Sequence, residues 1–126
     1  MLLAVCQEFN IENEIIPKIA TCFGGGIGNT GDVCGAVTGA VMAIGLIRKQ
    51  STSLEEWMET AAVAKTFCQR FSEEMGTIKC KELTKLDFSM EDGLEQMMNS
   101  EVAMMVCFPA VATAFQITMD LLKSEQ

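Results

Sequence analysis

The chain has 126 residues, of which 49% are apolar and 21% are charged. This length and apolar content fit one compact domain over residues 1–126 and exclude a disordered chain. The formal net charge is −8, which disfavours nucleic acid and anionic membranes as binding partners. We therefore expect protein or small-molecule partners, with no nucleic acid and no membrane.

Histidine is absent from the sequence. This excludes a Ser-His or Cys-His nucleophile, a His-ligated haem and an imidazole-ligated zinc site. The six cysteines remain as candidate reactive groups or metal ligands. The chain opens without the basic segment of a secretory signal. We therefore expect a cytoplasmic protein with reduced thiols rather than a disulfide framework.

The first third of the chain predicts two helices. Residues 1–9 are apolar and resemble the tail of a helix. Residues 11–23 carry isoleucines at helical spacing and predict a second helix, within which Pro17 either introduces a kink or marks the first turn.

A glycine-rich loop precedes the helix that we expect to be central. The loop contains Gly24, Gly25, Gly26 and Gly28. Thr30 or Asp32 is the expected N-cap, and residues 33–47 contain no charge, so this helix should be buried on most sides. Its small residues recur at a spacing of four, which gives one face that another helix can approach closely. These residues are Gly35, Gly39 and Ala43.

The middle of the chain predicts one long and one short helix. Ser53-Leu-Glu-Glu56 is a capping-box pattern, which predicts a helix over residues 54–75. A short helix is expected over residues 78–86, and a polar connection over residues 87–93.

The last helix is expected to begin near residues 90–94 and to end near Lys123, with Pro109 as a kink. Residues 102–115 are apolar nearly all round, which predicts a central position in the core. The predicted fold is an all-α, compact bundle of about five or six helices with the glycine-rich loop before its central buried helix.

Cys34 is the first candidate for a reactive residue. It follows the glycine-rich loop and falls in the first turn of the predicted helix. Unpaired backbone N–H groups and the helix dipole favour a thiolate there. The alternative role is packing, because a free cysteine is commonly a small buried hydrophobe.

Cys80 and Cys107 are the next candidates. Cys80 lies between two lysines, whose charges would lower the pKa of its thiol if that thiol is accessible. Cys107 lies two residues before Pro109, where a kink would free a backbone carbonyl. Core packing is again the alternative for both, and it is the favoured role of the other three cysteines.

The glycine-rich loop contains Gly26-Ile-Gly28-Asn-Thr-Gly31, which matches the letters of a dinucleotide-binding fingerprint. The context is wrong, because a helix rather than a strand precedes it and no acidic residue follows about twenty residues later. Successive glycines can still turn N–H groups toward an anion, a thiolate or an inorganic sulfide. The alternative is a flexible turn between helices.

Residues 23–28 and the segment Cys34-Gly-Ala-Val-Thr-Gly39 resemble the C_GCAxxG_C_C family of redox-active proteins. The signature of that family is Cys-Gly-Ala-x-x-Gly with further, separated cysteines, and Cys80 and Cys107 match two of these. A fourth cysteine of the pattern, expected before residues 2–5, has no counterpart in this sequence, and Cys6 could substitute only if the helix geometry allows it. The resemblance implies a redox or metal-binding role, an iron–sulfur cluster as cofactor and a redox partner protein.

Three hypotheses follow. In the first, Cys34, Cys80 and Cys107 converge at the mouth of the glycine-rich loop and hold an iron–sulfur cluster or another metal, or act as a redox dithiol. The backbone groups that would support this site belong to Gly24, Gly25, Gly26, Gly28 and Gly35. In the second, the acidic bundle is an interaction module or a homodimer joined through the small face of the Gly35 helix, and the cysteines only pack. In the third, the loop binds a small anionic ligand.

Overall fold

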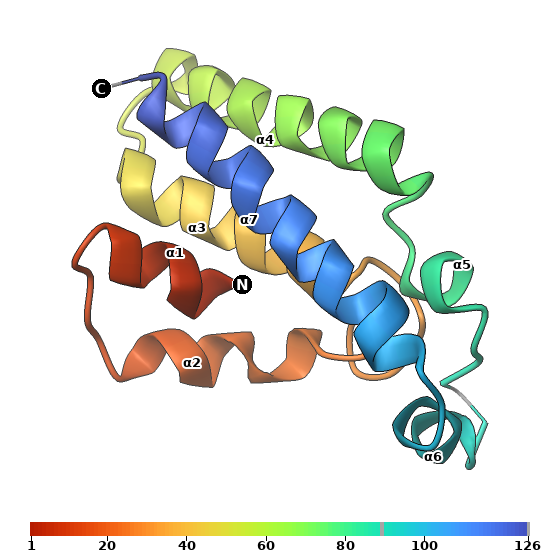
Figure 1. Cartoon of the computed structure of the whole chain (residues 1–126). Coiled ribbons are helices and arrows are strands. Elements are labelled where there is room, and N and C mark those ends of the chain that lie inside the picture. The colour runs from red at the N-terminus through yellow and green to blue at the C-terminus, as the bar shows by residue number, and fades with distance from the viewer. Residues whose placement is uncertain (89, 126) are drawn as a thin grey trace.

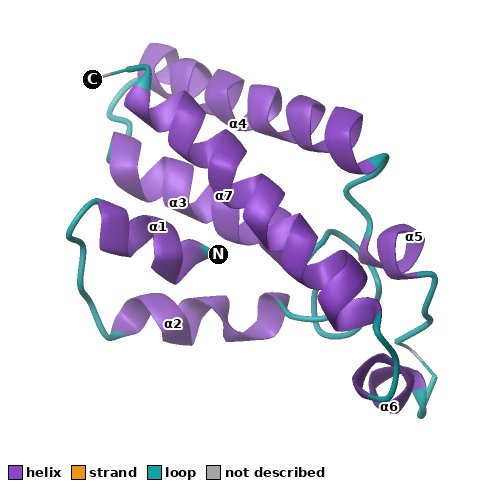
Figure 2. Cartoon of the chain, in the orientation of Figure 1, coloured by secondary structure: helices purple, strands orange, loops and turns teal. Residues whose placement is uncertain are grey.

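The computed structural model describes residues 1–88 and 90–125. Within these ranges it is all-α, as the sequence predicts (Figures 1 and 2). Ser89, in the predicted polar connection, and Gln126 lie outside the described residues. The α-helices are α1 (Leu2–Glu8), α2 (Ile15–Ala20), α3 (Gly35–Arg48), α4 (Leu54–Met75), α5 (Cys80–Thr84), α6 (Gly93–Met98) and α7 (Phe108–Lys123). A 3₁₀ turn, η1 (Thr21–Phe23), follows α2, and a π-helical turn, η2 (Ala103–Cys107), precedes α7.

The core lies where α3, α4 and α7 pack against one another, with α1 against α3 and α7 (Figure 1). α3 contributes Ile44 and α7 contributes Ile117, and both side chains are fully buried. On α4, Phe67 and Phe71 are fully buried and their ring centroids lie 6.0 Å apart. Burial of these large apolar groups supplies the main driving force for folding.

The second helix begins later than the sequence predicts. The N–H of Ile15 donates to the side-chain oxygen of Asn13 at 2.9 Å, and α2 starts there. Pro17 lies in the first turn of α2, which is the second of the two roles expected for it. A proline is tolerated in a first turn because its missing N–H would have no helical acceptor.

The central helix also begins later than predicted. Cys34, not Thr30 or Asp32, is the N-cap of α3, so the predicted N-cap is wrong. The physical reason is that the chain before Cys34 is extended and pairs with the segment before α5. The small face of α3 is covered within the same chain, since a Cβ on Gly39 would lie 3.1 Å from the Cβ of Met1.

The long fourth helix matches the prediction. The side chain of Ser53 accepts a hydrogen bond from the N–H of Glu56 at 3.2 Å, which caps the start of α4. Gly76 ends the helix with φ at +92°, a left-handed conformation that suits glycine.

The expectation of one continuous last helix is wrong. α6 ends at Met98, and the chain turns through residues 99–102 before η2 begins. Within η2 the N–H of Phe108 donates to the carbonyl of Ala103, five residues earlier. The π-helical turn accommodates Pro109, which has no N–H to donate to an earlier carbonyl. A simple kink was expected at this position.

The segment Ala103–Lys123 is long and apolar enough to cross a membrane by length and composition alone. α3 and α4 pack against α7, and 33% of the most apolar stretch of this segment is buried. Its first turns depart from the predicted all-round burial, because Met104, Met105 and Phe108 are exposed.

Candidate functional site

The segments that precede α3 and α5 pair as a single antiparallel bridge. The N–H of Cys34 donates to the carbonyl of Ile78 at 2.8 Å, and the N–H of Cys80 donates to the carbonyl of Asp32 at 2.7 Å. In such a pairing, alternate residues project to the same side. Cys34 and Cys80 are therefore diagonal neighbours on one side of the bridge, a relation that places residues about 7–8 Å apart.

Cys107 reaches the same place from a third element. The turn η2, which ends at Cys107, packs against α5. Burial raises the pKa of Cys107, and the nearby charge of Cys34 raises it further. Three thiols from separate parts of the sequence thus lie close enough to influence one another's ionisation.

Cys80 is the most enclosed of the three thiols, with 8% of its surface exposed. Burial raises its pKa to about 11, and the charges of Cys34 and Cys107 add to the rise, while a hydrogen bond with Thr84 opposes it. The neighbouring lysines were expected to lower the pKa only of an accessible thiol, and the Cys80 thiol is buried. Both lysine side chains form ion pairs with acidic residues: Lys79 pairs with Asp32, and Lys81 lies 4.0 Å from Asp87.

The glycine-rich loop forms a left-handed turn. Residues 25–29 all have positive φ between +58° and +71°. Ile27 is among them, and this conformation is costly for a β-branched residue. The N–H of Gly28 donates to the carbonyl of Cys22 at 2.8 Å, and the N–H of Asp32 donates to that of Gly26 at 2.9 Å. The second half of the loop therefore uses its backbone N–H groups to hold its own shape.

Gly26 packs directly on the site. A Cβ at this position would lie 2.6 Å from the Cβ of Cys80 and 2.7 Å from backbone atoms of Asp32. Only glycine allows this approach, and its φ of +71° is also one that glycine adopts readily. The loop thus covers Cys80 and contributes to its burial.

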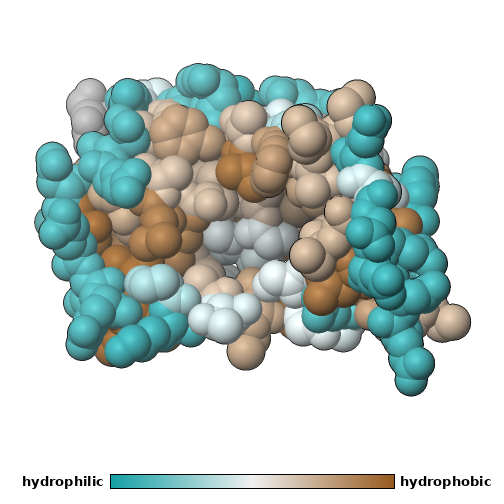
Figure 3. All heavy atoms as spheres, turned by 60° about the horizontal axis from the view of Figure 1, so that its bottom comes forward, coloured by the Kyte–Doolittle hydropathy of each residue, from teal (hydrophilic) through white to brown (hydrophobic). Residues whose placement is uncertain are grey.

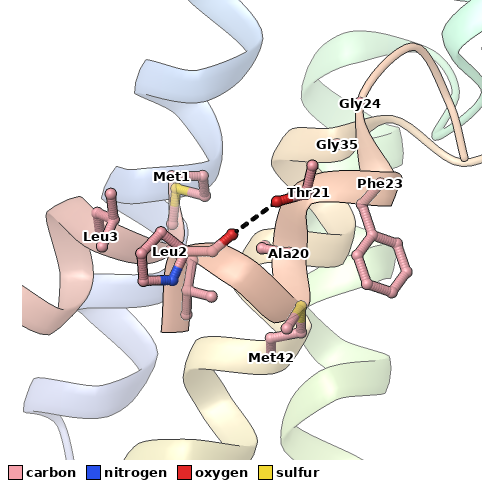
Figure 4. A pocket seen from close by; sticks show the side chains of 11 residues that line it. Met1, Leu2, Leu3, Ala20, Thr21, Phe23, Gly24, Gly35 and Met42 are labelled. Atoms are coloured by element: carbon pink, nitrogen blue, oxygen red, sulfur yellow. Dashed lines mark hydrogen bonds between the residues drawn. The ribbon is translucent and has the colours of Figure 1, made fainter. Parts of the chain in front are cut away.

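Gly24 and Gly35 belong to a neighbouring feature. They line a cavity of about 300 Å³ between α1, the end of α2 and the start of α3. Figure 4 shows this cavity, with Thr21 donating to the carbonyl of Pro17 at its edge.

A wider groove of about 600 Å³ between α2 and α3 is lined largely by apolar side chains. The face in Figure 3 carries apolar groups on either side of a hollow.

The remaining cysteines lie apart from the three-thiol site. Cys6 is 1% exposed in the core and burial alone raises its pKa, so it is not placed as a fourth site residue. Cys68 is half-buried on α4 and Cys22 is exposed on η1. All six cysteines are free thiols. In residues 1–88 and 90–125, no three Cys, Asp or Glu side chains are arranged as a set that could hold a metal ion.

The described residues form an all-α protein in which the segments that carry Cys34 and Cys80 are joined by backbone hydrogen bonds beside a glycine-rich turn. The family model "Putative redox-active protein (C_GCAxxG_C_C)" matches residues 1–121, and the chain belongs to this family. An uncharacterized protein of Archaeoglobus fulgidus is 29% identical over 134 residues, covering 98% of this chain and 82% of that protein. No solved structure matched the chain.

Proposed function

We propose that the protein carries out reversible thiol–disulfide chemistry at Cys34, Cys80 and Cys107. The observation that supports this most strongly is the convergence of three thiols from the N-cap of α3, the start of α5 and the end of η2. Cys34 and Cys80 are 46 positions apart in the sequence, and Cys80 and Cys107 are 27 positions apart. Local structure does not bring such distant residues together, so the cluster depends on the fold.

Cys34 is the proposed nucleophile. It occupies the N-cap position of a helix of 14 residues, and helix N-termini in general favour negative charge. Its thiolate would attack a disulfide of a redox partner protein and form a mixed disulfide. A second thiol of the site, Cys80 or Cys107, would then attack Cys34 and release the partner. The two thiols lose two electrons and two protons and become a disulfide, and the partner's disulfide becomes a dithiol.

The raised pKa values of Cys80 and Cys107 fit a resolving role. Both side chains remain protonated thiols near neutral pH, and the reaction of Cys34 removes its negative charge, which is one cause of each raised pKa. A cytoplasmic location is part of this proposal, because a reducing compartment would return the disulfide to the dithiol form.

An iron–sulfur cluster remains a prediction. Thiolates are the ligands that such clusters prefer, but the described residues are not disposed as a metal-holding set. We therefore derive no step through a cluster. Iron and acid-labile sulfide, measured after purification without oxygen, report directly on whether one is bound.

The test is a thiol count before and after oxidation. The reduced wild-type protein should lose two of its six thiols with diamide and regain them with dithiothreitol. Cys34→Ser should abolish this reversible loss, and Cys68→Ser is the matched control that should retain it. Equal behaviour of the two variants would contradict the proposal and favour an interaction module in which the cysteines only pack.

A further inference from the structure

Six large apolar side chains on α6, its flank and the first turns of the last helix are exposed. These elements lie at one end of the bundle (Figure 1). We call this set the methionine face. Its members and their exposed fractions are Met90 (60%), Leu94 (48%), Met98 (74%), Met104 (69%), Met105 (69%) and Phe108 (63%). Cys107 lies within this run, so the face borders the three-thiol site.

The area of the methionine face is large for a monomer. At about 200 Å² for one large apolar side chain, these exposed fractions amount to on the order of 700 Å². Apolar patches on monomeric proteins reach about 300–600 Å². A stable dimer buries about 800 Å² on each partner, so this face provides most of the apolar area that a dimer requires.

The charges that flank the face are unequal on its two sides, although Lys79 and Lys81 on the α5 side are paired with Asp32 and Asp87. Residues 79–87, which include α5, carry three lysines and two acids, whereas residues 90–101, which include α6, carry four acids and no basic residue. η2 packs against α5 and follows α6 along the chain. A two-fold axis through the face would set the acidic side of each copy against the more basic side of the other.

We propose that the protein forms a two-fold symmetric dimer in which the methionine face of one copy packs against the same face of a second copy. The second copy then closes the solvent side of Cys107. Methionine side chains suit such a contact because they are flexible and adapt to one another. This proposal goes beyond the thiol chemistry and does not depend on it.

The test is the oligomeric state of the reduced protein, measured by sedimentation equilibrium from micromolar to submillimolar concentration. The wild-type protein should be a dimer. The double variant Met104→Glu with Phe108→Glu should raise the dissociation constant by at least about a hundredfold, since buried charge would replace apolar contact. A monomeric wild-type protein, or a dimer that survives this variant, would overturn the proposal.

The chain offers a matched control at the other end of the bundle. Leu54 is 72% exposed and Met58 is 59% exposed at the start of α4. Leu54→Glu with Met58→Glu should leave the dimer intact, and loss of the dimer in this control would also overturn the proposal. All four positions are exposed, so both variants should keep the helical circular dichroism of the wild-type protein.

Two further measurements separate the proposal from its alternatives. Alkylation of Cys107 should slow as protein concentration rises through the dimer transition, and a rate independent of concentration would count against it. Vesicles of neutral phospholipid should not bind the protein. Flotation of monomeric protein with such vesicles, abolished by Met104→Glu, would show that the face docks on lipid instead.

Discussion

The backbone N–H of Cys80 donates to the carbonyl oxygen of Asp32 at 2.7 Å. This bond connects the strand-like segment before α3 to the start of α5, 48 residues later in the sequence. It also sets the distance between Cys34 and Cys80, because both lie on the same side of the bridge. The cysteine site is therefore fixed by backbone pairing rather than by helix packing alone.

The first prediction concerns the contact between the loop and Cys80. Gly26→Ala should destabilise the protein by about 2–4 kcal/mol, because a left-handed alanine costs about 1–2 kcal/mol and the overlap with Cys80 adds a similar amount. Gly28→Ala is the matched control, since Gly28 also has positive φ but a Cβ there would meet no other atom within 4 Å. It should cost only about 1–2 kcal/mol. Urea unfolding measures both, and equal losses would show that the contact with Cys80 is unimportant.

The second prediction concerns pH. The pKa of Cys80 is about 11 in the folded protein against an ordinary value of 9.0. The folded state thus holds this proton more tightly than the unfolded state. The resulting stability is fully present below about pH 9 and is lost as the pH rises through about 11.

Two pKa units correspond to about 2–3 kcal/mol. Unfolding of the reduced protein, measured between neutral and strongly alkaline pH, should show this loss in the wild type. Cys80→Ala should show less of it over the same pH range. Parallel stability curves for the two proteins would refute the assignment to Cys80.

The third prediction concerns the π-helical turn. Pro109→Ala restores a backbone N–H, which allows residues 103–107 to relax to a regular α-helix. Stability should be maintained or should rise by about 1 kcal/mol, because the regained helical hydrogen bond offsets the greater conformational freedom that alanine gives the unfolded chain. An α-helical turn holds about one residue fewer than a π-helical turn. The change therefore rotates the chain before α7 by about 100° relative to α7, and Cys107 should leave the site. We expect the diamide-induced disulfide of this variant to join Cys34 to Cys80 and to leave Cys107 alkylatable, and oxidation of Cys107 in the variant would argue against this role of the turn.

The fourth prediction concerns the start of α4. Ser53→Ala removes the acceptor for the N–H of Glu56 and should cost about 1 kcal/mol. Thr66→Ala is the control, because Thr66 lies inside the same helix and its hydroxyl donates only to the carbonyl of Ala62. That change should be neutral or slightly stabilising, since alanine is the better helix former. Thermal unfolding distinguishes the two variants, and an unchanged stability of Ser53→Ala would show that the Ser53 cap does not stabilise α4.

Helical periodicity and local capping signals predict much of this fold. The all-α class and the capped start of α4 follow from patterns that act within a few residues. Two features depend instead on contacts between distant residues. The bridge before α3 moves the N-cap to Cys34, and the break between α6 and η2 leaves Met104 and Met105 exposed although their segment is apolar throughout.

The candidate site shows the same division. The cysteine motif and the family resemblance single out Cys34, Cys80 and Cys107, and in the structure the charges of Cys34 and Cys107 help to raise the pKa of Cys80. The sequence does not reveal that Cys80 is buried beneath Gly26, because the flanking lysines suggest an accessible, activated thiol. The sequence also does not show that these lysines pair with Asp32 and Asp87.

The most direct test of the central claim is to map disulfides by mass spectrometry after mild oxidation of the reduced wild-type protein. We predict one intramolecular disulfide that joins Cys34 to Cys80 or to Cys107, while Cys6, Cys22 and Cys68 remain alkylatable. A disulfide that involves any of these last three, or six free thiols after oxidation, would contradict the account.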